Sequence, residues 1–276
     1  MKRILTAVVA LPILLVTVWS PSPYYFVILS TIAALLALGE FYSLATKARC
    51  KPQVVTGFCA ALVVIASFVF EEPLLTVAAL IAVAIVTLVG AVFRPSELKE
   101  SLVSVSSTIF GVIYVALLAS CLVGVRMISD TRFATPVSHL SSKALTMFFA
   151  IVIFTDTGAY YTGRTIGRHK LAPRISPGKT IEGAIGGFVM AAVAGYVSKL
   201  TFFPEIPIAH CLVLGAIIGI VGQIGDLAES LLKRGSDVKD SGRLLPGHGG
   251  MLDRIDSILF SAPVLYFYFR LFFVSQ

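Results

Sequence analysis

The last part of the sequence concentrates the side chains that could do chemistry. Residues 226–256 hold eleven charged residues within 31 positions, six acids and five Lys or Arg, although charged residues make up only 13% of the chain. Carboxylates can hold Mg²⁺ through oxygen ligands, and Lys or Arg beside them can clamp phosphate oxygens. The stretch therefore indicates transfer of a phosphorus group, which depends on positioning and charge neutralisation.

Helical spacing places several of these side chains on shared faces. Asp226, Ser230 and Lys233 stand at positions i, i+4 and i+7, which lie on one face of a helix. Asp253 and Asp256 are three residues apart and share a face at the start of a second helix. We therefore expect acids from two neighbouring helix ends to lie beside Lys and Arg.

The loop that joins these two helices, residues 235–249, is polar. A glycine-rich run at 246–250 leads from it into the second helix. Glycines let backbone N–H groups approach a phosphate without obstruction by side chains. Taken one at a time, these residues have plainer explanations. Lys233 and Arg234 would then be anchors of membrane topology, and His248 a loop histidine without a role.

A second polar element spans residues 176–183. Ser176 is a good N-cap and Pro177 a good first helical residue, so we expect a helix to begin here. Helix N-termini bind anions, and Lys179 adds a charge there. The spacing does not match a Walker A loop, and an ordinary capped helix is the alternative.

The elements that carry these residues are predicted to span a membrane. Hydrophobic residues make up 57% of the 276 and the mean hydropathy is +0.92, which excludes an ordinary cytosolic enzyme, a secreted disulfide scaffold and a disordered protein. A membrane-spanning helix needs roughly 20 mostly apolar residues. Such stretches lie at about 4–20, 22–46, 53–70, 73–93, 103–126, 143–166, 180–202, 208–234 and 250–274. We predict an all-α polytopic integral membrane protein with about nine transmembrane helices.

The distribution of Lys and Arg predicts the topology. Fifteen of them fall on the side of the N-terminus and only four clearly on the other. Because positive charge stays in the cytoplasm, the N-terminus and the loops 167–179 and 235–249 are predicted to be cytoplasmic, and the C-terminus to face out. We expect the first segment to be a retained helix and not a removed signal peptide.

The two halves of the chain differ in chemistry. Residues 1–142 read as transmembrane scaffold helices, in which Glu40 is the main charge inside an apolar stretch and has no partner among its sequence neighbours. Residues 143–276 are the expected catalytic region, because acids inside apolar stretches mark functional sites. Glycines four apart at 183 and 187, and at 215 and 219, indicate close helix packing or a subunit interface.

Residues 230–256 read SLLKRGSDVKDSGRLLPGHGGMLDRID and resemble the signature of the phosphatidate cytidylyltransferase (CDP-diacylglycerol synthase) family. Every fixed position of that signature is met: Ser230, Lys233, Arg234, Lys239, Asp240, Gly242, Pro246, His248, Gly249, Gly250, Asp253, Arg254 and Asp256. Residues 176–183 are similar to the family's SPxKTxEG element. The first 140 residues agree with the family in hydropathy and length only.

The resemblance implies transfer of a cytidylyl group from CTP to phosphatidate, giving CDP-diacylglycerol and pyrophosphate, with Mg²⁺ as cofactor and a second divalent or monovalent cation as an open alternative. It implies a multi-pass protein of the bacterial cytoplasmic (inner) membrane, with a cytoplasmic active site and a homodimer as an open alternative. The implied catalytic residues are Asp226, Asp253, Lys233 and Lys179. The implied metal ligands are Asp226, Asp253, Asp256 and Asp156. The implied substrate contacts are Ser176, Arg234, Lys239, Asp240, Arg243, His248, Gly249, Gly250 and Arg254.

Two alternatives come from other classes of protein. A secondary transporter also keeps acids within the membrane, but it is expected to show inverted repeats, which the sequence lacks. A non-catalytic scaffold leaves the charge density of residues 226–256 unexplained. Nucleic-acid binding is excluded, because no soluble basic surface with stacking aromatics is apparent.

Overall fold

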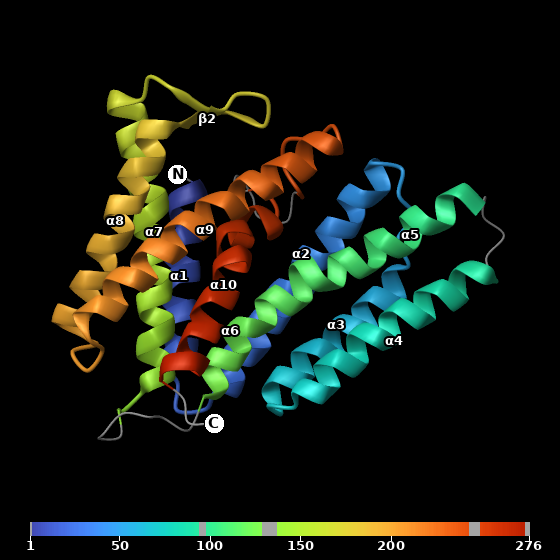
Figure 1. The fold of residues 1–276 in the computed structure, drawn as a ribbon, viewed down its shortest axis with the longest axis horizontal. Coiled ribbons are helices and arrows are strands. Elements are labelled where there is room, and N and C mark those ends of the chain that lie inside the picture. Colours follow the sequence, from blue (N-terminus) through green and yellow to red (C-terminus); the bar gives the residue numbers. More distant parts are fainter. Residues whose placement is uncertain (1, 94–97, 129–136, 243–248, 274–276) are drawn as a thin grey trace. The chain divides into compact units, whose positions relative to one another are not determined.

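A computed structural model describes residues 2–93, 98–128, 137–242 and 249–273 (Figure 1). Apart from one two-stranded hairpin, the regular structure of this part of the chain is helical. The chain divides into two compact units. Unit 1 holds residues 1–127 and 232–255, and unit 2 holds residues 128–231 and 256–276. Residues 232–255, which the sequence places in the catalytic half, thus pack with the N-terminal helices.

Each apolar stretch of the sequence forms a helix, with ends that lie within a few residues of the expected ones. In unit 1 these are α1 (Lys2–Trp19), α2 (Tyr24–Lys47), α3 (Val54–Val69), α4 (Pro73–Val92), and an unbroken run of α5 (Leu98–Gly111), the π-helical η1 (Val112–Leu117) and α6 (Leu118–Met127). In unit 2 they are α7 (Leu140–Ile166), α8 (Ile181–Thr201), most of α9 (Ile208–Gly235) and most of α10 (Leu252–Phe272).

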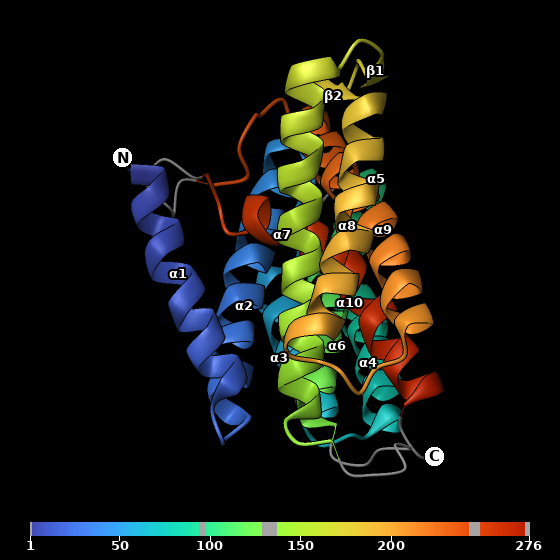
Figure 2. The ribbon, with the colours of Figure 1, turned by 90° about the vertical axis from the view of Figure 1, so that its left-hand side faces the viewer.

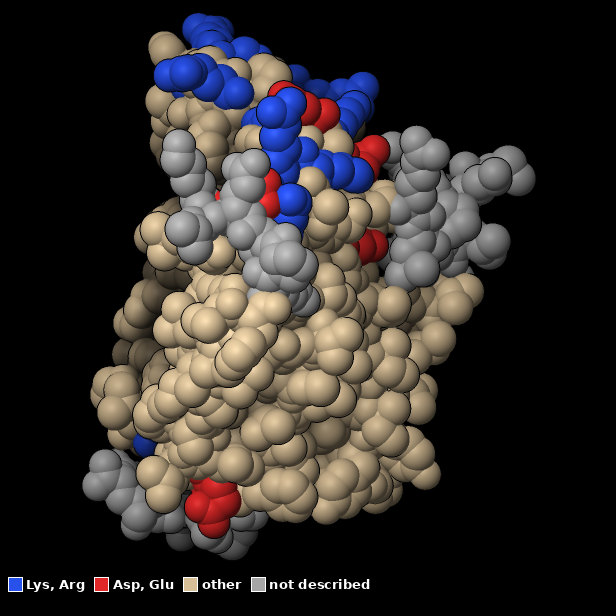
Figure 3. Space-filling view, turned by 90° about the vertical axis from the view of Figure 1, so that its right-hand side faces the viewer, with Lys and Arg blue, Asp and Glu red and all other residues tan. Residues whose placement is uncertain are grey.

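Seven helices of the described part are long and apolar enough to cross a membrane. Val9–Trp19 and Val54–Val69 are shorter apolar helices. The predicted class, an all-α polytopic membrane protein, is confirmed, whereas the count of nine spans stays a prediction. Large apolar side chains face outward, as in Leu74, Val92 and Phe93, which are 78%, 77% and 82% exposed. Uncharged side chains cover most of the face in Figure 3, as expected for a surface solvated by lipid.

Unit 1 is held together by a few polar contacts between its apolar helices. Tyr42 of α2 is buried and donates a hydrogen bond from its hydroxyl to the carbonyl of Thr108 on α5 (3.0 Å). The backbone N–H of Gln53 donates to Thr108 Oγ1 (2.7 Å), and its side-chain Nε2 donates to the carbonyl of Thr87 on α4 (2.7 Å). Paired groups of this kind lock helices together where neither lipid nor water can replace the partner.

Unit 2 contains long helices in close contact, and α7 and α8 lie side by side (Figure 2). A Cβ at Gly183 would lie 2.8 Å from the carbonyl of Ala159, and one at Gly215 of α9 would lie 2.7 Å from the carbonyl of Ala191. Such distances leave no room for a side chain. The glycine spacing seen in the sequence therefore serves helix packing within the chain.

The segment before α8 differs from the expectation. Strands β1 (Lys170–Ala172) and β2 (Ser176–Thr180) form an antiparallel hairpin in which Lys170 pairs with Thr180. The N-cap of α8 is Thr180, whose side chain accepts a hydrogen bond from the backbone N–H of Gly183 (3.1 Å). The prediction that Ser176 caps this helix is wrong, because Thr180 is also a good N-cap and the strand pairing holds the residues before it extended.

Candidate active site

A cavity in unit 2 collects one group of the predicted residues. Its volume is about 570 Å³ and its walls come from α7, the hairpin, α8 and α9. Four predicted site residues line it: Asp156, Ser176, Lys179 and Asp226. Residues that the sequence did not single out also line it, among them Tyr160, Arg164 and Gln223. Three of the four elements lie close together in the sequence, and α9 brings Asp226 to them.

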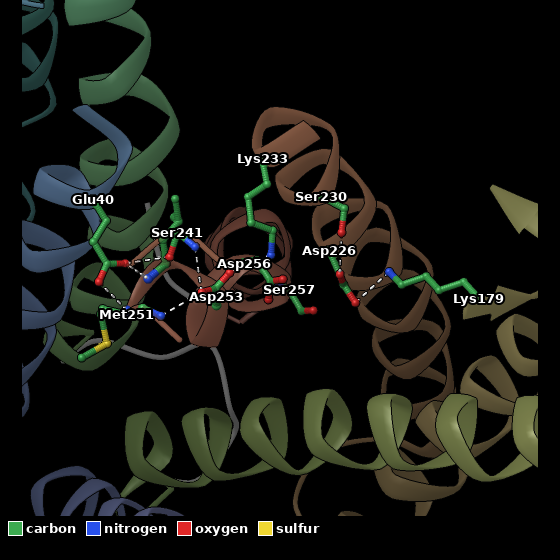
Figure 4. Close-up of polar contacts among 12 residues, drawn as sticks. Glu40, Lys179, Asp226, Ser230, Lys233, Ser241, Met251, Asp253, Asp256 and Ser257 are labelled. Carbon is green, nitrogen blue, oxygen red and sulfur yellow. Dashed lines mark hydrogen bonds and ion pairs between the residues drawn. The ribbon is translucent and has the colours of Figure 1, made fainter. Parts of the chain in front are cut away.

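The charged centre of this cavity is an ion pair between the hairpin and α9. Lys179 Nζ lies 2.7 Å from Asp226 Oδ2, and the two side chains are 27% and 35% exposed (Figure 4). Ser230 Oγ makes a long contact of 3.5 Å with the other oxygen of Asp226, as the i, i+4 spacing predicts. Because both charged side chains remain partly open, a ligand in the cavity can replace either partner.

Other contacts fix the walls of the cavity. Gln223 of α9 donates from Nε2 to the carbonyl of Ala184 on α8 (3.2 Å) and to that of Gly219 (3.0 Å). Glu182 accepts hydrogen bonds from the backbone N–H groups of Arg168 (3.0 Å) and His169 (3.2 Å), which turns the chain before β1. Glu182, the acid of the element at residues 176–183, therefore supports the hairpin that carries Lys179.

A second group of predicted residues lies in unit 1, at the start of α10. Lys233 Nζ contacts Asp253 Oδ1 at 2.6 Å, and the two side chains are only 15% and 7% exposed. The other oxygen of Asp253 accepts hydrogen bonds from the backbone N–H groups of Ser241 (3.0 Å) and Gly250 (2.8 Å). We call Lys233, Ser241, Gly250 and Asp253, together with Glu40, the α10-start cluster; Figure 4 labels all of these except Gly250.

Glu40 is the charged member of this cluster that sequence reasoning missed. It lies on α2, and its carboxylate accepts hydrogen bonds from Ser241 Oγ (2.9 Å) and from the backbone N–H groups of Met251 (2.9 Å) and Leu252 (2.8 Å). The only sequence signal for it is an acid alone inside an apolar helix. Its partners are about 200 residues away, so spacing could not reveal them.

The remaining predicted residues fall into three sets. Exposed side chains in or near the turn after α9 and at the start of α10 are Arg234, Lys239, Asp240 and Arg254. Gly249 has a positive φ of 79°, which favours glycine, and Asp256 is buried with the backbone N–H of Ser257 on its Oδ1 (2.6 Å). Arg243 and His248 lie outside the described residues. The structure does not test the role of any of these residues, which stays a prediction.

The donor set can be compared with the needs of Mg²⁺. Among the described residues, no three His, Cys, Asp or Glu side chains form a group that could hold a metal by themselves. Asp156 and Asp226 nevertheless line one cavity. Mg²⁺ is usually bound by one or two carboxylates and completes its shell with waters and substrate phosphates. These two residues fit that pattern once a ligand replaces Lys179 at the partly exposed Asp226, whereas the nearly buried Asp253 would have to release Lys233 or a backbone N–H group.

The fold and the site define a polytopic membrane protein with two charged polar clusters set in apolar helices. The sequence profile of the Cytidylyltransferase family matches residues 1–272, and the chain belongs to this family.

Three relatives bear the name phosphatidate cytidylyltransferase. The protein of Bacillus subtilis (strain 168) is 48% identical over 139 residues, which are 49% of this chain and 52% of the relative. That of Staphylococcus saprophyticus is 49% identical over 117 residues, 42% of this chain and 45% of the relative. That of Brucella suis biovar 1 is 50% identical over 133 residues, 46% of this chain and 47% of the relative. The matched regions span about half the length of these relatives.

Proposed function

We propose that the chain transfers the cytidylyl group of CTP to phosphatidate, giving CDP-diacylglycerol and pyrophosphate. The observation that carries the proposal is the cavity that Lys179, Asp226 and Asp156 line, with Lys179 and Asp226 in an ion pair. It combines cations for phosphate oxygens, Lys179 and Arg164, with two carboxylates suited to Mg²⁺. Membership of the Cytidylyltransferase family and relatives named phosphatidate cytidylyltransferase support this assignment.

In the proposed reaction, an oxygen of the phosphatidate phosphate attacks the α-phosphorus of CTP. The new O–P bond forms as the bond between the α-phosphorus and the bridging oxygen breaks, and that oxygen leaves with the pyrophosphate. A phosphomonoester has a second pKa near 6, so the nucleophile is largely ionised at pH 7 and needs no strong general base. The chain has to position two anions and offset their charge.

The roles of the residues follow from their chemistry. Lys179 is proposed to bind phosphate oxygens in the cavity, and Asp226 with Asp156 to hold Mg²⁺ there. Bound Mg²⁺ would neutralise the triphosphate and ease the departure of pyrophosphate. Lys233 and Asp253, which lie in the α10-start cluster, are proposed to act as a further phosphate clamp and as a further metal ligand.

The setting of the reaction is also a proposal. We infer that the protein lies in the bacterial cytoplasmic membrane, with the cavity open to the cytoplasm, where CTP is found. The basic residues of the hairpin segment, Arg168, Lys170 and Arg174, support this orientation because positively charged loops stay in the cytoplasm.

The first experiment measures pyrophosphate release by the purified protein in detergent, given CTP, phosphatidate and Mg²⁺. Omitting each component in turn should abolish the release. A transporter or a scaffold protein predicts no release under any of these conditions. Absence of release from folded protein, with several lipids tested, would contradict the proposal.

A further inference from the structure

The start of α10 is anchored by a side chain from outside its own segment. The first backbone N–H groups of a helix have no partner within it and are usually capped by a neighbouring residue. Here the N–H groups of Met251 and Leu252 donate to Glu40, and that of Gly250 donates to Asp253. Three consecutive amides are thus shared between two carboxylates. A negative charge at this end is also favoured by the helix dipole.

Ser241 joins the two carboxylates directly. Its Oγ donates to Glu40 Oε2 (2.9 Å), and its backbone N–H donates to Asp253 Oδ2 (3.0 Å). A change in the position of Glu40 would therefore move Ser241 and weaken one of the bonds that orient Asp253. Since Asp253 also contacts Lys233 (2.6 Å), the effect would reach both charged members of the pair.

Two glycines of the signature support the same reading. A Cβ at Gly242 or at Gly250 would collide with the carboxylate of Glu40, and the one at Gly250 also with Ser241 Oγ. Neither glycine has a positive φ, so a backbone conformation that favours glycine is not the reason why glycine stands at these two positions. Their lack of a side chain is what lets Glu40 approach the turn.

We propose that Glu40 is a positioning residue, which fixes the first turn of α10 and thereby the orientation of Asp253 and Lys233. The inference rests on the proposed function for its effect on catalysis. It assigns a role in the site to the N-terminal helices, which the sequence describes only as a scaffold. Glu40 contacts no substrate in this proposal and acts through Ser241 and the amides of residues 250–252.

The test compares Glu40→Gln with Glu100→Gln. Glutamine keeps the shape of Glu40 but replaces one acceptor oxygen with an NH₂ group that cannot accept from the amides. Glu100 is also an acid of unit 1 and lies 2.6 Å from Lys51, in an exposed ion pair. We expect Glu40→Gln to lower kcat about 10- to 100-fold, the usual effect of losing an orienting partner, with the KM for phosphatidate unchanged. Glu100→Gln should match the wild type.

A cap that served stability alone would give a different pattern. Glu40→Gln would then lower Tm but keep the wild-type kcat at temperatures where the protein is folded, and this result would overturn the proposal. Glu40→Asp keeps the charge on a shorter side chain and should restore part of the lost kcat. No recovery above the level of Glu40→Gln would also count against a positioning carboxylate.

Hydrogen exchange separates this inference from the proposed function. Peptides covering residues 249–253 should exchange faster in Glu40→Gln than in Glu100→Gln, whether or not the wild type releases pyrophosphate. A wild type without activity would refute the proposed function, and unchanged exchange would refute the anchoring. If Glu40→Gln yields no folded protein, Gly242→Ala replaces it, because its Cβ displaces the Glu40 carboxylate. Wild-type kcat and exchange in that variant would overturn the proposal.

Discussion

Asp226 and Asp253 are held in different ways, and this difference suggests different roles. Asp226 faces a cavity, and its ion pair with Lys179 is partly exposed. The oxygens of Asp253 accept from Lys233 and two backbone N–H groups, and its side chain is almost buried. Exchanging a partner for a ligand costs less at Asp226, because a buried charge that loses its partner is strongly penalised.

Asp226→Asn tests the role of the cavity carboxylate. The substitution keeps the size of the side chain but removes its charge, so we expect kcat to fall about a hundredfold or more, the order seen when one preorganised electrostatic group is lost. Pyrophosphate release at saturating CTP and phosphatidate measures it. Asp237→Asn is the control, because Asp237 is exposed, and its positive φ of 54° is a conformation that Asn also adopts. Full activity of Asp226→Asn would remove Asp226 from the reaction.

The pair of Lys233 and Asp253 is expected to contribute to stability as well. A double-mutant cycle with Lys233→Met and Asp253→Asn should give a coupling free energy of unfolding of about 1–3 kcal/mol, as for groups in one network. The pair of Lys51 and Glu100 has the same 2.6 Å separation but side chains 64% and 36% exposed. Its cycle, measured by thermal unfolding in detergent, should give about 0–1 kcal/mol. Equal coupling free energies in the two pairs would contradict the expectation that burial strengthens the ion pair of Lys233 and Asp253.

At the scale of the elements, the helices of unit 2 are placed by residues that have no side chain. Gly183 lets α8 approach α7, and Gly215 lets α9 approach α8. The cavity lies among these three helices and the hairpin. Close packing therefore sets the distance between Lys179, which immediately precedes the N-cap of α8, and Asp226 on α9.

Gly215→Ala and Gly235→Ala form a matched pair that tests this packing. A Cβ at Gly215 would lie 2.7 Å from the carbonyl of Ala191, whereas one at Gly235 would meet nothing within 4 Å. We expect Gly215→Ala to destabilise the protein by about 1–3 kcal/mol through overpacking. Gly235→Ala should leave the Tm nearly unchanged. Thermal unfolding in detergent checks both, and an unchanged Tm for Gly215→Ala would show that the helices can separate without cost.

At the scale of the whole molecule, the orientation in the membrane decides which substrates can reach the cavity. Of the two proposed substrates, CTP is soluble and phosphatidate is a lipid, so the proposed reaction requires a site that is open to both phases. The proposed topology places the hairpin in the cytoplasm and the turn between α8 and α9 on the opposite side. Arg174 in the hairpin and Pro204 in that turn are both exposed.

Cysteine labelling tests this topology. In a background without the four native cysteines, Arg174→Cys should react with a membrane-impermeant thiol reagent only in inside-out vesicles. Pro204→Cys should react only in vesicles of the opposite orientation. The two variants control for each other, since each shows that the reagent and the vesicles behave as intended. The reverse pattern would contradict a cytoplasmic cavity.

The sequence by itself determined the class of fold, and it predicted which residues could form the site. Long apolar runs can only form membrane-spanning helices, because backbone polar groups in lipid must be paired within the segment. Local spacing likewise predicted the i, i+4 contact between Asp226 and Ser230. The choice of N-cap before α8 failed, since both Ser176 and Thr180 satisfy the local preference and strand pairing decided between them.

Only the tertiary structure decided which distant residues meet. It brought Asp226 to the hairpin that carries Lys179, and it placed Glu40 of α2 on the amides of Met251 and Leu252, where α10 begins. Periodicity shows which face of a helix a residue occupies but not which helix lies opposite. That pairing depends on where glycines allow backbones to approach and on which partly buried carboxylate needs donors, and these conditions exist only in the packed chain.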